Sequence, residues 1–151
     1  MKNSAKLEKI LLDICGDNVE AHRFALAWIA YVHRIDDLVD GYIGKDATEL
    51  VKTFVDAAEL YSSNFYQQNA HYLFPIVCLV SNDYLDSELM KFSSDDVLKL
   101  KWAEYLSFSG IYMLQTIALI CGGYDRLRKI SIPLRECSLK DHFDTITKER
   151  I

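Results

Sequence analysis

Glycine and proline are scarce in this chain of 151 residues, which contains only six glycines and two prolines. A sheet protein with many tight turns needs more of both, so the composition favours long uninterrupted helices. Half of the residues are hydrophobic and 26% are charged, which is typical of a globular domain that buries a core. We therefore predict an all-α fold, a compact bundle of five to six antiparallel helices that forms a single domain over residues 1–151.

Paired cysteines, an excess of basic residues and a secretory signal are also missing. The four cysteines form no CxxC pair and mostly lie in apolar stretches, which predicts reduced, buried thiols. The net charge of -5 argues against nucleic acid or anionic lipid as a partner and favours cations. The first 14 residues lack a continuous apolar run and a small-residue cleavage site, which predicts a cytoplasmic protein.

One long stretch lacks charge altogether. Residues 105–124 contain no Asp, Glu, Lys or Arg, and their number is about what a helix needs to span a bilayer. Polar side chains at Ser107, Ser109, Gln115 and Thr116 dilute the stretch. We therefore favour a central helix of the bundle over the alternative of a membrane span, because a helix that is apolar nearly all round is buried in a soluble protein.

Apolar residues recur at helical spacing along the chain, and capping residues mark the expected helix ends. Asp17 or Asn18 can cap the start of the second helix, Gly41 and Gly44 mark its end, and Asp46 with Glu49 resembles a capping box for the third. Pro75 suits the first turn of the fourth helix. The expected helices cover about residues 5–15, 18–40, 47–66, 75–90, 95–121 and 138 onwards, with a basic segment at 126–129 before the last.

Three aspartates stand near the end of the second expected helix, in the segment WIAYVHRIDDLVDG at residues 28–41. At 100° per residue, Asp36, Asp37 and Asp40 fall within an arc of about 100° and can converge on one ligand. Like charges at this spacing repel each other, and acids oppose the dipole at a helix C-terminus, so a bound cation would offset both costs. Hard oxygen ligands with room for phosphate favour Mg²⁺ or Mn²⁺ over zinc.

A different interpretation of these aspartates needs no metal. Solvated acids on a helix end are common, and His33, Arg34 and Lys45 are placed to neutralise them. The chain is then a non-catalytic helical interaction protein that binds a partner through an exposed apolar patch. A small bundle with so many hydrophobic residues also has limited interior, which predicts a homodimer.

Residues 24–42 resemble the first aspartate-rich helix of the squalene and phytoene synthases, an isoprenoid synthase family. In that family an aromatic, arginine-containing helix ends in a DDxxD-type motif. The resemblance implies that Asp36, Asp37 and Asp40 hold magnesium ions that bind a prenyl diphosphate, with Arg34 near the phosphate. It implies a Mg²⁺-dependent, diphosphate-binding protein of the prenyl transferase type.

The size of the chain is similar to that of a second family, the all-α NTP pyrophosphohydrolases, which include the dimeric dUTPases. In that family two acidic motifs on separate helices hold magnesium against a nucleoside triphosphate. The aspartates at residues 36–40 resemble the first motif, and Asp83 with Asp86 would supply the second. In both families the metal neutralises and orients a diphosphate, and the two differ in whether a carbon–oxygen bond ionises or water attacks.

Overall fold

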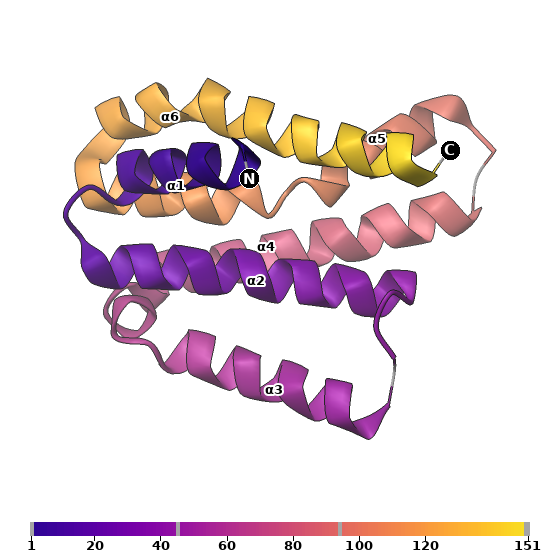
Figure 1. Cartoon of the computed structure of the whole chain (residues 1–151), viewed down its shortest axis with the longest axis horizontal. Helices are drawn as coiled ribbons and strands as arrows, with labels where there is room; N and C mark the ends of the chain where they lie inside the picture. Colours follow the sequence, from indigo (N-terminus) through magenta and orange to yellow (C-terminus); the bar gives the residue numbers. More distant parts are fainter. Residues whose placement is uncertain (1, 45, 94, 150–151) are drawn as a thin grey trace.

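The computed structural model describes residues 2–44, 46–93 and 95–149, with side chains described for residues 5–44, 46–93 and 95–138. Over these ranges the chain forms helices and no strand, which confirms the predicted all-α class (Figure 1). The helices are α1 (Lys2–Cys15), α2 (Val19–Asp40), α3 (Ala47–Ser62), α4 (Asn64–Ser93), α5 (Val97–Ser107) and α6 (Ile111–Glu149).

The first helix boundaries lie where the capping residues predict them. The side chain of Asn18 accepts a hydrogen bond from the Ala21 amide at 2.9 Å, and that of Asp46 accepts one from the Glu49 amide at 3.0 Å. Each bond satisfies an amide that has no partner within its helix. Gly41 ends α2 in the left-handed conformation, with φ of 80°. Its amide donates to the carbonyl of Asp37, in the manner of a glycine C-cap.

The prediction for the fourth helix was wrong at its start. Helix α4 begins at Asn64 and bends at Asn69, where φ is -119°. The Asn69 side-chain amide donates to the carbonyl of Phe65 at 2.9 Å, which satisfies a carbonyl that the bend leaves without its helical partner. Pro75 lies inside the helix and is exposed. Because proline has no amide hydrogen, it cannot donate to the carbonyl of His71, and this carbonyl lies on the solvent side of the helix.

The predicted helix at 95–121 is two helices. The backbone breaks at residues 108–110, where the Trp28 indole donates to the carbonyl of Gly110 at 3.1 Å. Beyond the break, the first helical part of α6 ends at Gly123, where the expected helix over 95–121 also ends, because its φ of 72° and ψ of -168° are not helical and are accessible only to glycine. A second helical part follows and continues through the exposed Pro133. The basic segment at 126–129 is therefore part of α6, and no separate helix begins at residue 138.

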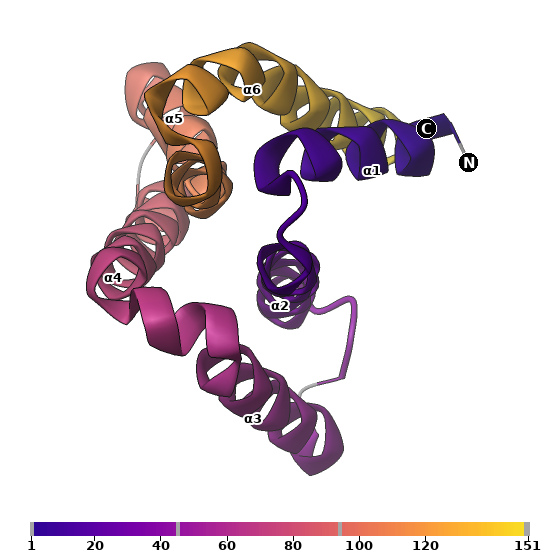
Figure 2. The ribbon, with the colours of Figure 1, turned by 90° about the vertical axis from the view of Figure 1, so that its left-hand side faces the viewer.

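The core lies where α1, α2, α4 and α6 meet. Helix α1 packs along α6, and both contact α2 (Figure 2). Fully buried side chains of the core come from all four of these helices: Leu11, Ile14, Phe24, Leu73, Met113, Ile117, Ile130 and Leu134. The predicted central position of the charge-free helix is confirmed for its part after residue 110, since Met113, Leu114, Ile117 and Ala118 are buried in this core.

Helices α2 and α4 run in the same direction, because α3 returns the chain between them. The ring of Phe24 lies 5.5 Å from that of Phe65, and further along both helices Asp36 contacts Tyr84. Helix α3 is antiparallel to α2 and diverges from α4 with distance from their junction at Ser63 (Figures 1 and 2). The C-terminal ends of α2 and α4 therefore lie on the same side of the bundle.

Burial of the thiols was predicted correctly only in part. Cys15 and Cys137 are buried and Cys121 is half-buried, but Cys78 is exposed on α4. All four are free thiols. Burial, with electrostatic repulsion from Cys121, raises the pKa of the Cys15 thiol to about 12, so this cysteine stays protonated and acts as a core side chain.

Taken singly, none of the described helices is long and apolar enough to cross a bilayer. One bent pair is formed by Val97–Ser107 and Ile111–Ser138, with an angle of 42° between its two parts. Counted together, these two parts have the length and the apolar composition that a membrane span needs.

Candidate functional site

The three predicted aspartates occupy the last turn and a half of α2, as their spacing requires. Asp36 and Asp40 are exposed, and Asp37 is half-buried. The carbonyl of Asp37 accepts hydrogen bonds from the amides of Gly41 and Tyr42, so its backbone closes the helix end. No basic residue lies in the last turn of α2, and the helix dipole therefore adds to the negative potential of the three carboxylates.

Asp36 reaches across to α4, where its Oδ1 accepts a hydrogen bond from the Tyr84 hydroxyl at 3.0 Å. Burial, together with the negative charge of Asp36 and this hydrogen bond, raises the pKa of Tyr84 above its ordinary value, and Glu88 and Asp40 add to the effect. The phenol is consequently held protonated as a donor. The raised pKa of Tyr84 thus indicates that carboxylates of both α2 and α4 lie near its hydroxyl.

We define the acidic cluster as Asp36 and Asp40 on α2 with Tyr84 and Glu88 on α4. Tyr84 and Glu88 are four residues apart and project from the same face of α4. The Glu88 side chain is 15% exposed and pairs with Lys91 at 2.6 Å. The cluster therefore combines hard carboxylate oxygens from two parallel helix ends with a fixed hydroxyl donor.

The acidic cluster suits a metal that takes few protein ligands. Within the part of the chain whose side chains are described, no three His, Cys, Asp or Glu residues are already placed to hold one ion. A structural zinc site needs such a preformed set. Mg²⁺ differs, because it usually takes one or two carboxylates and completes its octahedron with water and phosphate oxygens. The donors present fit Mg²⁺ or Mn²⁺ in the presence of a phosphate-bearing ligand.

Arg34 lies on the other side of α2 and contacts α3. Its guanidinium donates to the Glu49 carboxylate at 2.6 Å and to the Thr53 hydroxyl at 3.0 Å, and lies 3.5 Å from an oxygen of Asp56. At 100° per residue it stands about 160° around the helix from Asp36. The structure therefore gives Arg34 carboxylate partners on α3 and places it apart from the acidic cluster.

Of the other residues predicted to surround the aspartates, His33 is exposed on α2, and Lys45 lies outside the described residues.

Neither of the secondary acidic candidates points to α2. Asp83 lines a small pocket with Tyr112 of α6, near Arg135. Asp86 is exposed and accepts a hydrogen bond from the Asn82 side chain at 3.1 Å. The acidic residue of α4 whose charge acts on Tyr84, beside Asp36 and Asp40, is Glu88, which was not among the predicted residues. Its only sequence signal is its position four residues after Tyr84, and this signal is too common to be specific.

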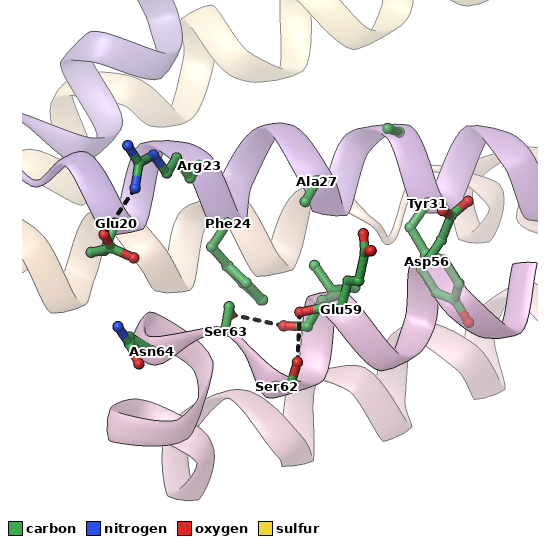
Figure 3. Close-up of a pocket in the computed structure, with 12 residues that line it drawn as sticks. Glu20, Arg23, Phe24, Ala27, Tyr31, Asp56, Glu59, Ser62, Ser63 and Asn64 are labelled. Carbon is green, nitrogen blue, oxygen red and sulfur yellow. Dashed lines mark hydrogen bonds and ion pairs between the residues drawn. The ribbon is translucent and has the colours of Figure 1, made fainter. Parts of the chain in front are cut away.

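A groove of about 520 Å³ lies between α2 and α3 (Figure 3). Phe24, Ala27 and Tyr31 of α2 form one wall, and Ser63 at the end of α3 belongs to the other. Ala27 stands about 180° around α2 from Asp36, so the groove is on a different side of the helix from the acidic cluster. The groove therefore does not extend that cluster.

Two aromatic side chains in the first half of α2 belong to the core. Phe24 and Trp28 are 2% and 3% exposed, and the Phe24 ring packs against Phe65 and Tyr66. Trp28 is therefore a core side chain, and Phe24 joins the core to the wall of the groove between α2 and α3.

Comparison of the chain with models of known protein families, with curated proteins and with solved structures finds no significant match.

Proposed function

We propose that this protein binds a diphosphate group through Mg²⁺ or Mn²⁺ held at the acidic cluster. The observation that carries the proposal is the hydrogen bond between Tyr84 and Asp36, because it joins the acidic ends of α2 and α4. When bound, the metal supplies charge neutralisation and orientation of the diphosphate. The chain would supply one or two carboxylates to the metal, from Asp36 and Asp40, with Glu88 adding negative charge near Tyr84.

The electrostatics of the α2 end support a cationic ligand. Asp36 and Asp40 are four residues apart at a helix C-terminus, where both their mutual repulsion and the dipole cost stability. Glu88, four residues after Tyr84 on α4, adds negative charge near Tyr84. A divalent cation would relieve all three effects, and it would then need an anionic ligand such as diphosphate to complete its coordination.

We further propose a prenyl diphosphate as the ligand, in agreement with the resemblance of residues 24–42 to the first aspartate-rich helix of the squalene and phytoene synthases. In the nucleoside triphosphate alternative, Asp83 and Asp86 form a second acidic motif opposite the aspartates of α2. Their positions do not favour it, because these two residues face away from α2.

The test is the thermal stability of the protein with and without Mg²⁺, pyrophosphate, farnesyl diphosphate and ATP. A ligand present at 100 times its dissociation constant stabilises the folded state by about 2.7 kcal/mol. For a chain of this size, that corresponds to a rise in Tm of about 5–10 °C. We expect this rise with Mg²⁺ and farnesyl diphosphate together, and a smaller one with Mg²⁺ and pyrophosphate.

Matched charge variants test the location of the site. Asp36→Asn with Asp40→Asn should abolish the rise in Tm, and Glu88→Gln should reduce it. Asp83→Asn with Asp86→Asn makes the same change in net charge elsewhere and should leave the rise intact. An absent rise in the unmodified protein would refute the proposal. Release of pyrophosphate from ATP, lost when Asp83 and Asp86 are replaced, would favour a pyrophosphohydrolase instead.

A further inference from the structure

Helix α4 carries an apolar stripe on the side that faces away from α5. The stripe consists of Phe74, Cys78, Leu85, Leu89 and Phe92, all exposed, and Phe92 is 87% exposed. At 100° per residue these five side chains fall within about 60° of one another. The opposite side of α4 is marked by Ser87, which is fully buried and donates to the carbonyl of Ala103 on α5 at 2.7 Å.

Helix α3 does not cover this stripe. The two helices diverge from their junction, so that the first half of α3 lies away from the second half of α4 (Figures 1 and 2). Helix α3 has its own exposed apolar side chains, among which Phe54 is 75% exposed. An apolar surface of this kind, rimmed by polar residues, is typical of an association site.

The total accessible surface is larger than that of a compact monomer. It amounts to 9892 Å², whereas a folded monomer of 17.4 kDa exposes about 7,900 Å² by the usual scaling with mass. The excess is about 2,000 Å² per chain. Obligate homodimers bury a total of about 2,000–5,000 Å², and two chains that each covered half of this excess would reach that range.

The distribution of charge along α4 favours a second copy of the same chain in an antiparallel arrangement. Residues 64–82 contain no Asp, Glu, Lys or Arg. Residues 83–91 contain three acidic residues, Asp83, Asp86 and Glu88, and one basic residue, Lys91. A parallel pair would place the acidic parts against each other. An antiparallel pair about a twofold axis places the acidic part of each helix against the uncharged part of its partner, which avoids that repulsion.

We infer that the apolar stripe of α4 binds the same stripe of a second copy, antiparallel about a twofold axis. Pairing Phe74 of one copy with Phe92 of the other follows from the spacing of the stripe, and it brings Cys78 close to Leu89 of the partner copy. The contact is isologous, so each stripe is used once and the assembly closes as a dimer. It involves none of the residues of the acidic cluster.

Sedimentation equilibrium between 1 and 100 µM tests the inference. We expect the unmodified protein to sediment at twice the mass of the chain, and the variant Phe74→Glu with Leu89→Glu to sediment as a folded monomer. The matched control is Leu12→Glu with Ile132→Glu, which places the same charges on exposed apolar residues of α1 and α6 and should remain a dimer. Circular dichroism confirms that each variant is helical.

A cross-linking experiment tests the antiparallel register. In Leu89→Cys, a short bismaleimide should join Cys78 of one copy to the introduced thiol of the other. Ile132→Cys should give no such product. A monomer at 100 µM, or a dimer that the stripe variant leaves unchanged, would overturn the inference. Monomeric protein that binds phosphatidylcholine vesicles through the stripe would overturn it in favour of a lipid surface.

Discussion

The two tryptophans of the chain allow a strict test of how the core is built. Trp28 is 3% exposed, and its indole Nε1 donates to the carbonyl of Gly110 at 3.1 Å, which joins α2 to the break between α5 and α6. Trp102 on α5 is 58% exposed. Replacing each by phenylalanine is the same chemical change in two opposite environments.

The expected cost of Trp28→Phe has two parts. Loss of the hydrogen bond costs about 1 kcal/mol. The smaller ring gives up roughly two methylenes of buried apolar surface, which costs about 1.6 kcal/mol at 0.8 kcal/mol each. The sum of about 2–3 kcal/mol corresponds to a fall in Tm of about 5–10 °C for a domain of this size. Trp102→Phe should change stability by less than about 0.5 kcal/mol, because the side chain is on the surface.

Thermal denaturation followed by circular dichroism measures both variants. Tryptophan fluorescence gives a second readout, since the Trp28 that remains in Trp102→Phe should emit at shorter wavelength than the Trp102 that remains in Trp28→Phe. A fall in Tm below about 2 °C for Trp28→Phe would show that the link between α2 and Gly110 does not stabilise the fold as argued. An equal fall for both variants would refute the difference in burial.

Three further changes have defined outcomes. Because burial and Asp36 raise the pKa of Tyr84 above its ordinary value of 10.0, the protonated phenol stabilises the folded state below pH 10, and this contribution is lost as the pH rises from 10 towards the higher folded pKa. The fall in Tm between pH 10 and 12 should therefore be shallower in Tyr84→Phe, and an unchanged slope would contradict the raised pKa of Tyr84. Gly41→Ala should destabilise the protein by about 1–2 kcal/mol in urea unfolding, because its φ is 80°, whereas Gly44→Ala serves as the control without positive φ. Arg34→Lys should lower the free energy of unfolding by about 1–2 kcal/mol, because an ammonium group cannot replace the planar guanidinium between Glu49 and α3, yet it should keep the response to Mg²⁺ and diphosphate. Loss of that response would instead assign Arg34 to the phosphate.

Local signals predicted the helix ends of α2 and the start of α3, because a cap depends on residues within one turn. Asn18, Gly41 and Asp46 act where the sequence places them. The break at residues 108–110 depends on Trp28, which lies on a distant segment, and was therefore missed. The small polar run SFSG at residues 107–110 was the available signal for a break.

The candidate site shows the same division. Helical spacing alone brings Asp36 and Asp40 to one side of α2. Which face of α4 meets them depends on how α3 returns the chain and on the direction of the bend at Asn69. The polar residues at 67–69 predict a break there, but local patterns do not give its direction. For this reason the sequence suggested Asp83 and Asp86, whereas the structure brings Tyr84 to Asp36 and places the charge of Glu88 near Tyr84.

The packing of α1 along α6 has a consequence for biosynthesis. Leu11 and Ile14 of α1 are fully buried in a core that also includes Ile130 and Leu134 of α6, and Asp13 pairs with Lys129 at 3.5 Å. These partners leave the ribosome long after α1 does. Because α1 packs mainly on α6, its apolar face stays exposed until α6 has been made, and we expect stable folding only after α6 has left the ribosome.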